Sequence, residues 1–229
     1  FPEPVSLNSG DLTRRRWLQC AGLVGVAGLP APAAWARSPV DYAKLLAFED
    51  GPSALGSRPV GLWVHADGSL CGVNAQHGTA NRGALFRLRA DGQPEVLHGF
   101  SAQEAGGWPE SLAIPCRGPA GFAYGTTGQG GAAGRGLVYR IDAAGHFEIL
   151  HEFTGGSEDV GWPSSHPLVV GPDGLLYGMS ISGDGALANQ TLVYRMTPTG
   201  TVSPLATLNV PLGLLNGLVL GADGQLYTA

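Results

Sequence analysis

The sequence predicts an all-β fold, in which four-stranded antiparallel sheets are arranged like the blades of a β-propeller. Three observations lead to this prediction. Short apolar runs of about five or six residues alternate with turns of Gly, Asp and Pro. A unit of about 53 residues recurs along the chain. Glycine (37) and proline (17) are abundant among the 229 residues, while charged residues make up only 14%. A β-sandwich is the main alternative, but it does not require so regular a period.

Residues 1–36 are predicted to be an export signal and not part of the fold. Arg14 and Arg15 stand shortly before an aromatic residue and a leucine, and an apolar run extends to Leu29. This order resembles the twin-arginine signal of bacteria. The apolar run of about a dozen residues is shorter than the roughly 20 that a membrane-spanning helix needs. We expect cleavage after Ala36 and delivery to the periplasm or beyond by the twin-arginine export machinery, with no transmembrane anchor.

Residues 37–229 form the predicted repeat domain. Residues 42–48 align with the last strand of a unit, and residues 226–229 match the second strand of another. With three whole units between them, the chain would hold about fifteen strands, or roughly 3.5 blades, where propellers close with 4 to 8. We therefore expect an array that is truncated at its C-terminus, with open edges liable to pair with other strands.

The third strand of each unit carries the clearest repeat. Residues 85–88 (LFRL) recur as 138–141 (VYRI) and 193–196 (VYRM), at offsets of 53 and 55 residues. Alternating apolar side chains and intervening turns define the other strands of a unit. In the second unit, the four strands are expected near Leu112–Cys116, Gly121–Thr126, Gly136–Asp142 and Phe147–Phe153.

Two dipeptides that contain glycine also recur. Asp-Gly pairs occur at 67–68, 173–174 and 223–224. They supply the positive φ of tight hairpin turns, and they lack the D-x-D-x-D-G ligand series of calcium loops. Cys-Gly or Tyr-Gly pairs occur at 71–72, 124–125 and 177–178. They indicate a strand whose backbone or ring packs closely against a glycine from the next sheet.

The second unit also resembles a known repeat family. Its segments are Tyr124-Gly125-Thr126-Thr127, a Gly-Gly loop at 130–131, Val138-Tyr139-Arg140 and Leu150-His151-Glu152-Phe153-Thr154-Gly155-Gly156. From Ala43 onward the chain resembles the GloVer tandem repeat of bacterial choice-of-anchor proteins, although the first and third units depart from Tyr-Gly-Thr-Thr. The resemblance implies a secreted, propeller-like repeat protein without an established activity, and it offers no catalytic residues.

No residue pattern predicts catalysis, a metal or a cofactor. His98 and His151 occupy equivalent positions, but that position holds Leu46 and Ala206 in other units, so we expect both imidazoles to pack. H-x-H, H-E-x-x-H and G-x-S-x-G motifs are absent from the sequence. The glycine-rich run 125–131 lacks the Lys-Ser/Thr of a phosphate-binding loop.

Two cysteines, Cys71 and Cys116, remain once the predicted signal is removed. They fall on strands of neighbouring blades and are a candidate disulfide pair in an oxidising compartment. Two buried free thiols are the alternative, because a bridge requires Cα atoms within about 7 Å of each other.

The net charge of −5 argues against a nucleic-acid partner. An exported chain without a catalytic signature is expected to be a non-enzymatic binding or scaffold module at the cell envelope, with a glycan or a protein there as its partner. The alternative is a propeller enzyme, a lyase or hydrolase that acts on a polysaccharide or a small molecule. Such an enzyme would gather acid, base and metal-binding side chains around a central channel.

A candidate binding face is expected on one side of the array. In a four-stranded unit, the loop between the second and third strands and the connection to the next unit emerge on the same side. These segments carry Gln76, His77, Trp108, Gln129, Trp162 and Asp184. Indole rings beside amide and carboxylate groups are typical of sugar-binding sites. The alternative is that Trp108 and Trp162, each held between Gly and Pro, fill the seams between blades.

Overall fold

The computed structural model describes most of the predicted repeat domain. The described residues are 46–48, 54–65, 67–89, 91–106, 113, 115–155, 161–163, 166–181, 190–211 and 215–228. The predicted signal residues Arg14, Arg15 and Ala36 lie outside these ranges, as do Trp108 and Asp184.

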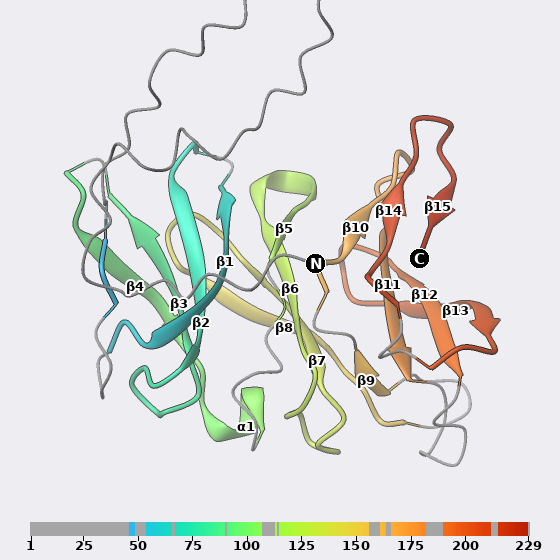
Figure 1. Ribbon diagram of the computed structural model, residues 1–229, viewed down its shortest axis with the longest axis horizontal. Coiled ribbons are helices and arrows are strands. Elements are labelled where there is room, and N and C mark those ends of the chain that lie inside the picture. The colour runs from blue at the N-terminus through green and yellow to red at the C-terminus, as the bar shows by residue number, and fades with distance from the viewer. Residues whose placement is uncertain are drawn as a thin grey trace, which may run out of the picture. The chain divides into compact units, whose positions relative to one another are not determined.

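Antiparallel sheets follow one another in chain order, and strands that are consecutive in the chain pair with each other, with one exception in the third sheet (Figure 1). The first sheet contains β1 (Ser57–Val64), β2 (Leu70–Gln76), β3 (Ala84–Leu88) and β4 (Pro94–Gly99). A helical turn, α1 (Ala102–Ala105), leads to the second sheet, with β5 (Cys116–Arg117), β6 (Ala123–Thr127), β7 (Leu137–Ile141) and β8 (Phe147–Glu152). The third contains β9 (Gly161–Pro163), β10 (Val169–Val170), β11 (Leu176–Ile181), β12 (Thr191–Met196) and β13 (Val202–Leu208). The fourth contains β14 (Val219–Leu220) and β15 (Leu226–Tyr227). The predicted all-β, propeller-like array of four-stranded sheets is confirmed.

Two short segments differ from the expectations. Leu46–Phe48, the described part of the expected leading strand, is not in a strand, and the Phe48 ring instead packs edge-on against Phe86, with 5.3 Å between centroids. The single turn of α1 was not expected either. It is stabilised by a capping box, in which Ser101 and Glu104 each accept a hydrogen bond from the other's backbone amide.

The first strand of each larger sheet is irregular. β1 shifts its pairing between Pro59 and Gly61. In the second sheet, the amide of Ala113 donates to the carbonyl of Thr126 (3.0 Å) before β5 begins. In the third sheet, β9 and β10 are separate pieces that both pair with β11. Trp162 therefore lies in β9 and not on the connection between sheets where we expected it, because the irregular first strand begins earlier than its apolar run.

A glycine on the second strand faces an aromatic ring on the third strand in each larger sheet. The directly opposed pairs are Gly72–Phe86, Gly125–Tyr139 and Gly178–Tyr194. A Cβ atom added to any of these glycines would overlap the facing ring. The ring and the glycine belong to neighbouring strands of the same sheet, and this corrects our expectation of a contact with a glycine from the next sheet. The reason is that directly opposed residues of paired strands approach most closely.

The Asp-Gly hairpins have the conformation predicted for them. Gly68, Gly174 and Gly224 have φ values of 84°, 77° and 77°. The preceding aspartate accepts a hydrogen bond from the amide two residues further on, as Asp67 does from Ser69 (2.9 Å). This hydrogen bond between the aspartate side chain and the backbone closes each turn.

Each sheet has two unlike faces. We call the face with the glycine–aromatic pair the glycine face, and the opposite face, which carries Arg87, Arg140 or Arg195 on the third strand, the arginine face. The arginine face of one sheet packs against the glycine face of the next. In the first interface, the buried residues are Trp63, Cys71 and Leu85 from the first sheet and Leu137, Tyr139 and Ile141 from the second. In the next, they are Tyr124 and Val138 from the second sheet and Leu168, Tyr194 and Met196 from the third.

The residue after the outermost strand completes each interface. Phe100 follows β4 and meets the ring of Tyr139 edge-on, with 5.5 Å between centroids. Phe153 follows β8 and meets Tyr194 in the same way at 5.6 Å. The ring that covers the glycine therefore also contacts the preceding sheet.

Replacing Gly125 with alanine should destabilise the fold by about 1–3 kcal/mol, since the added methyl group must displace the buried Tyr139 ring. The measurement is equilibrium denaturant unfolding of wild type, Gly125→Ala, Tyr139→Leu and the double variant. In the Tyr139→Leu background the same glycine substitution should cost markedly less, because the ring is gone. An equal cost in both backgrounds would contradict this account of the pair.

Candidate functional site

Several loops meet at one end of the sheets, which we call the loop end. The amide of Phe100, just after β4, donates a hydrogen bond to the carbonyl of Gly83 in the β2–β3 loop (77–83), at 3.1 Å. The β6–β7 loop (128–136) donates from the amide of Gly131 to the carbonyl of Gln103 in α1 (2.7 Å). These hydrogen bonds hold the β2–β3 loop beside the residue that follows β4, and the β6–β7 loop beside α1.

Gln76 and His77 lie at the loop end of the first sheet. Gln76 ends β2 opposite Ser57. The hydroxyl oxygen of Ser57 lies 2.6 Å from Nδ1 of His77, and both His77 and Gln76 are half-buried. His77 has a φ of 57°, a backbone angle that residues other than glycine rarely adopt. The contact with Ser57 therefore holds the imidazole of His77 against β1.

The β6–β7 loop is held from both sides. Thr127, at the end of β6, donates from its hydroxyl to the carbonyl of Glu104 in α1 (2.9 Å). On the other side, the amide of Trp162 in β9 donates to the carbonyl of Arg135 (2.7 Å). Gln129 lies between these attachments and is half-buried. The loop is thus fixed by hydrogen bonds to main-chain groups of α1 on one side and of β9 on the other.

The Trp162 ring is paired with a cation. The guanidinium carbon of Arg135 lies 3.9 Å from the centroid of the indole, a cation–π contact. A Cβ atom on Gly155 would lie 3.1 Å from Nε of Arg135, so this glycine makes room for the guanidinium. One face of the half-buried indole is therefore covered by protein. Arg135 was missed in the sequence, although Arg-Gly precedes the third strand in two units, as Arg82-Gly83 and Arg135-Gly136.

The structure brings together only part of the predicted face. Gln129 and Trp162 lie on and beside the same loop, while Gln76 and His77 belong to the first sheet. These groups offer a ring, an amide and an imidazole for stacking and hydrogen bonding. Trp108 and Asp184 fall outside the described residues.

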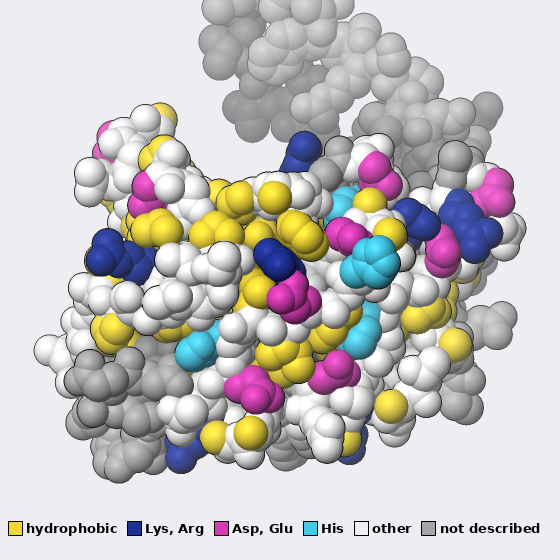
Figure 2. Space-filling view, turned by 180° about the vertical axis from the view of Figure 1, so that it is seen from behind, with side chains coloured by type: hydrophobic (Ala, Val, Ile, Leu, Met, Phe, Trp, Pro, Cys, Tyr) yellow, Lys and Arg dark blue, Asp and Glu magenta, His cyan; other side chains and the backbone are white. Residues whose placement is uncertain are grey.

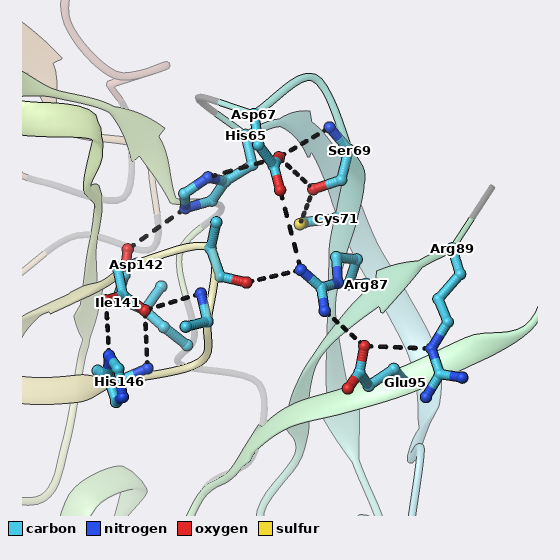
Figure 3. Close-up of polar contacts among 12 residues, drawn as sticks. His65, Asp67, Ser69, Cys71, Arg87, Arg89, Glu95, Ile141, Asp142 and His146 are labelled. Atoms are coloured by element: carbon cyan, nitrogen blue, oxygen red, sulfur yellow. Dashed lines mark hydrogen bonds and ion pairs between the residues drawn. The ribbon is translucent and has the colours of Figure 1, made fainter.

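A second polar cluster joins the first sheet to the second (Figure 3). Arg87 in β3 donates to Glu95 of β4 (2.6 Å) and to the carbonyl of Ala143 in the second sheet (2.7 Å). His65 is buried, with its Nε2 3.5 Å from the carbonyl of Ile141. Asp67 lies 3.8 Å from Nη1 of Arg87. The cluster links two sheets through side chains that reach backbone carbonyls.

The residue types in this cluster could suggest nucleophilic catalysis, but the geometry does not support it. Asp67 receives hydrogen bonds from the hydroxyl and the amide of Ser69, and these bonds lower its pKa. Cys71 is fully buried, and burial raises the pKa of its thiol. Ser69 and Asp67 therefore close a turn, and Cys71 packs in the core.

Both described cysteines, Cys71 and Cys116, are free thiols. Burial raises the pKa of Cys116 to about 12, so its thiolate is scarce at neutral pH.

His98 packs between sheets. Its ring stacks on Phe147 of the second sheet, with 3.7 Å between centroids, and meets Phe100 edge-on at 5.2 Å. Its Nε2 lies 3.3 Å from the carboxylate of Glu104. Burial lowers the pKa of His98, although Glu104 acts in the opposite direction. His151 meets Phe153 edge-on at 4.8 Å, so both histidines make aromatic contacts.

Charged side chains of both signs are interspersed on the face shown in Figure 2, with histidines and hydrophobic side chains between them. Within the described ranges, no three His, Cys, Asp or Glu side chains are grouped so that they could hold a metal ion. The described part of the chain contains no helix with the length and hydrophobicity needed to cross a bilayer.

Comparison with known proteins gives one family. The model of the Gloeobacter/Verrucomicrobia repeat matches residues 39–229. None of the curated proteins matches the chain.

Among solved structures, the chain is similar to one assigned as a gluconolactonase, with 18% identity and a TM-score of 0.46 over 74% of this chain and 56% of that one. It is also similar to dipeptidyl peptidase 4 of Porphyromonas gingivalis (17% identity, TM-score 0.38, 62% of this chain and 18% of that one). A third structure, assigned as a glycosidase of Bacteroides thetaiotaomicron, has 15% identity and a TM-score of 0.40 over 77% of this chain and 68% of that one. The chain thus spans about half the length of the first structure and less than a fifth of the second.

The lowered pKa of His98 should make the protein less stable in mild acid. As the pH falls, His98 is protonated near pH 6.5 in the unfolded chain but only at a lower pH in the folded chain. The free energy of unfolding is therefore at its full value above about pH 6.5, and it decreases as the pH falls towards the pKa of His98 in the folded chain. His98→Gln, which does not titrate, should lose less stability than wild type between about pH 7 and pH 5. Denaturant unfolding at several pH values measures both slopes. Identical slopes would show that His98 does not contribute.

Proposed function

Since the chain belongs to the Gloeobacter/Verrucomicrobia repeat family, we propose that it is an exported, non-catalytic repeat module that binds or scaffolds at the cell envelope. Repeat proteins combine a recurring framework with loops that can vary independently of it.

The observation that carries the proposal is the contrast between framework and loops. The framework positions recur as the same interactions: the glycine–aromatic pair, the Asp-Gly turn and the phenylalanine after the last strand. The β2–β3 loop reads HGTANRG over 77–83, while the β6–β7 loop reads GQGGAAGRG over 128–136. Different loops on one framework are typical of binding surfaces.

A glycan is the ligand that the loop end suits best. Trp162 and Gln129 place an aromatic ring and an amide beside one loop, and that loop is fixed by hydrogen bonds to α1 and to β9. A sugar would stack on an indole and exchange hydrogen bonds with the amide. The guanidinium of Arg135 against the indole also supports the packing interpretation of Trp162, so the test has to separate binding from folding.

The order of residues in 1–36 supports export. Arg14-Arg15, the short apolar run and the Ala34-x-Ala36 site together are typical of a twin-arginine signal. The twin-arginine machinery would be the first partner of the chain, and the periplasm or the exterior its place of action.

Trp162→Ala should weaken binding to polysaccharide or cell-wall fractions about tenfold, the equivalent of about 1.4 kcal/mol, because a stacking surface is lost. Gln129→Ala should weaken it less. Binding is measured by sedimentation with insoluble cell wall and by calorimetry with soluble polysaccharide.

The matched control is Trp162→Phe, which retains a ring, and thermal unfolding is followed for every variant. If Trp162→Ala unfolds the protein while Gln129→Ala leaves binding intact, Trp162 is a packing residue and the glycan face is wrong. Release of sugar products from the same fractions would instead favour the alternative, a polysaccharide lyase or hydrolase.

Replacing Arg14 and Arg15 together with lysine should abolish export, because the twin-arginine route reads the guanidinium pair. Cell fractionation and immunoblotting of the periplasm measure the effect. Arg16→Lys is the matched control and should still be exported. Unchanged export of the double variant would rule out this route.

A further inference from the structure

Arg135, in the β6–β7 loop, has hydrogen-bond donors that the described residues do not use. Its Nη1 is shielded from solvent and has no acceptor among them. No described carboxylate forms an ion pair with Arg135, although the side chain of Glu152 borders the same loop at Gly131. A shielded N–H without an acceptor is unfavourable, so an acceptor supplied by a ligand would be stabilised there.

The arginines of the framework differ from Arg135 in this respect. Arg87 lies 2.6 Å from the carboxylate of Glu95 on the neighbouring strand. Arg140 lies at the same distance from Glu148. These two guanidinium groups are neutralised within their own sheets, whereas the charge of Arg135 has no such partner in the described ranges.

The same feature occurs in the first unit. Arg82 lies two residues before β3, as Arg135 lies two residues before β7. Its Nε is also shielded from solvent and without an acceptor in the described part of the chain. The third unit has Gln190 at this position, and its amide donates to Asn209 (2.9 Å). The unused arginine donors therefore belong to two consecutive units.

Trp162 determines which part of Arg135 faces a ligand. The indole covers one flat face of the guanidinium, while the N–H donors point outward in the guanidinium plane. Trp162 has a φ of 50°, which is rare for a bulky residue, and such strain is typical of functional sites. A Cβ atom on Gly161 would lie 3.6 Å from Cδ of Arg135, so this glycine, like Gly155, leaves room for the side chain.

A carboxylate is the anion that suits this arrangement best. Its two oxygens can accept two parallel hydrogen bonds from the edge of one guanidinium. Arg135 is the single charged residue in the loop sequence 128–136, and it can balance one negative charge. The chain as a whole has a net charge of −5, so attraction of an anionic ligand has to come from such local cations.

From these observations we propose that the glycan bound at the loop end is acidic, a polysaccharide of uronic acid units whose carboxylates are bound by Arg135 and Arg82. This inference rests on the proposed glycan-binding function and names the class of its ligand. Gln129, in the same loop as Arg135, would exchange hydrogen bonds with the sugar hydroxyls. Carboxylates that recur along a polymer match arginines that recur from unit to unit, and simultaneous contacts strengthen binding.

The first test changes only the ligand. Polygalacturonate and its methyl ester have the same sugar backbone, but the ester lacks the negative charge. Wild type should bind polygalacturonate about tenfold more tightly than the ester, because only the acid forms a charge-assisted pair with a guanidinium. Polyglutamate, which has carboxylates but no sugar, should also bind about tenfold more weakly. Calorimetry with the 229-residue chain measures all three affinities.

The second test changes the arginines. Arg135→Gln should weaken binding of polygalacturonate about tenfold and leave binding of the ester unchanged. Arg135→Lys keeps the charge but not the planar fork, so its loss should be smaller. Arg82→Gln should act like Arg135→Gln, and the double variant should lose more than either. Arg117→Gln is the matched control, because Arg117 is exposed at the opposite end of the second sheet.

Equal affinity of wild type for the acid and the ester would overturn the acidic ligand and leave glycan binding in place. Binding to cell-wall fractions but not to polygalacturonate would do the same. Equal affinity for polyglutamate would indicate an acidic peptide as the ligand instead. If Arg135→Gln weakens both polymers alike and lowers the thermal unfolding temperature, Arg135 is a packing residue and the assignment is wrong. No binding to any polysaccharide or cell-wall fraction would overturn the proposed glycan face itself.

Discussion

The contact of a glycine with the aromatic ring opposite it is the constraint on which the rest of the structure depends. It fixes the register between the second and third strands, since the ring of Tyr139 can lie flat only where the neighbouring strand has no side chain. Register in turn decides which residues face which neighbour, because a slip by one residue would exchange the two faces of a sheet. The same ring then meets Phe100 of the preceding sheet. One local pair thus sets both the sheet and the packing between sheets.

Much of this framework could be predicted from the sequence, because repeats and turns are local signals. The third strands and the positive φ of Gly68 and Gly174 were predicted as they occur. The partner of each glycine was not, because strand register depends on residues far apart in sequence. Trp162 was placed on a connection for a similar reason, since the break between β9 and β10 leaves no apolar run to mark the strand. Arg135 could have been found only by asking why Arg-Gly recurs before the third strand.

The polar residues of the framework serve mainly to join segments. Arg87 and Arg140 pair with glutamates on the adjacent strand, and Arg87 also reaches a carbonyl of the next sheet. Asp67 closes a turn, and Cys71 is buried where a thiolate is disfavoured. Residue types that resemble catalytic groups in a sequence are therefore accounted for by the folding of the sheets. What differs between the units is the loop end.

The attachment of the β6–β7 loop to both α1 and β9 has a consequence for how this surface can change. The two attachments use the amide of Gly131 and the carbonyl of Arg135, so they depend on the path of the backbone more than on the side chains between them. Ala132 and Ala133, which lie between the two, are exposed. New side chains at these two positions would alter the chemistry of the loop surface while its supports stay in place. Point substitutions alone could therefore place different recognition groups on this loop without a change in its backbone.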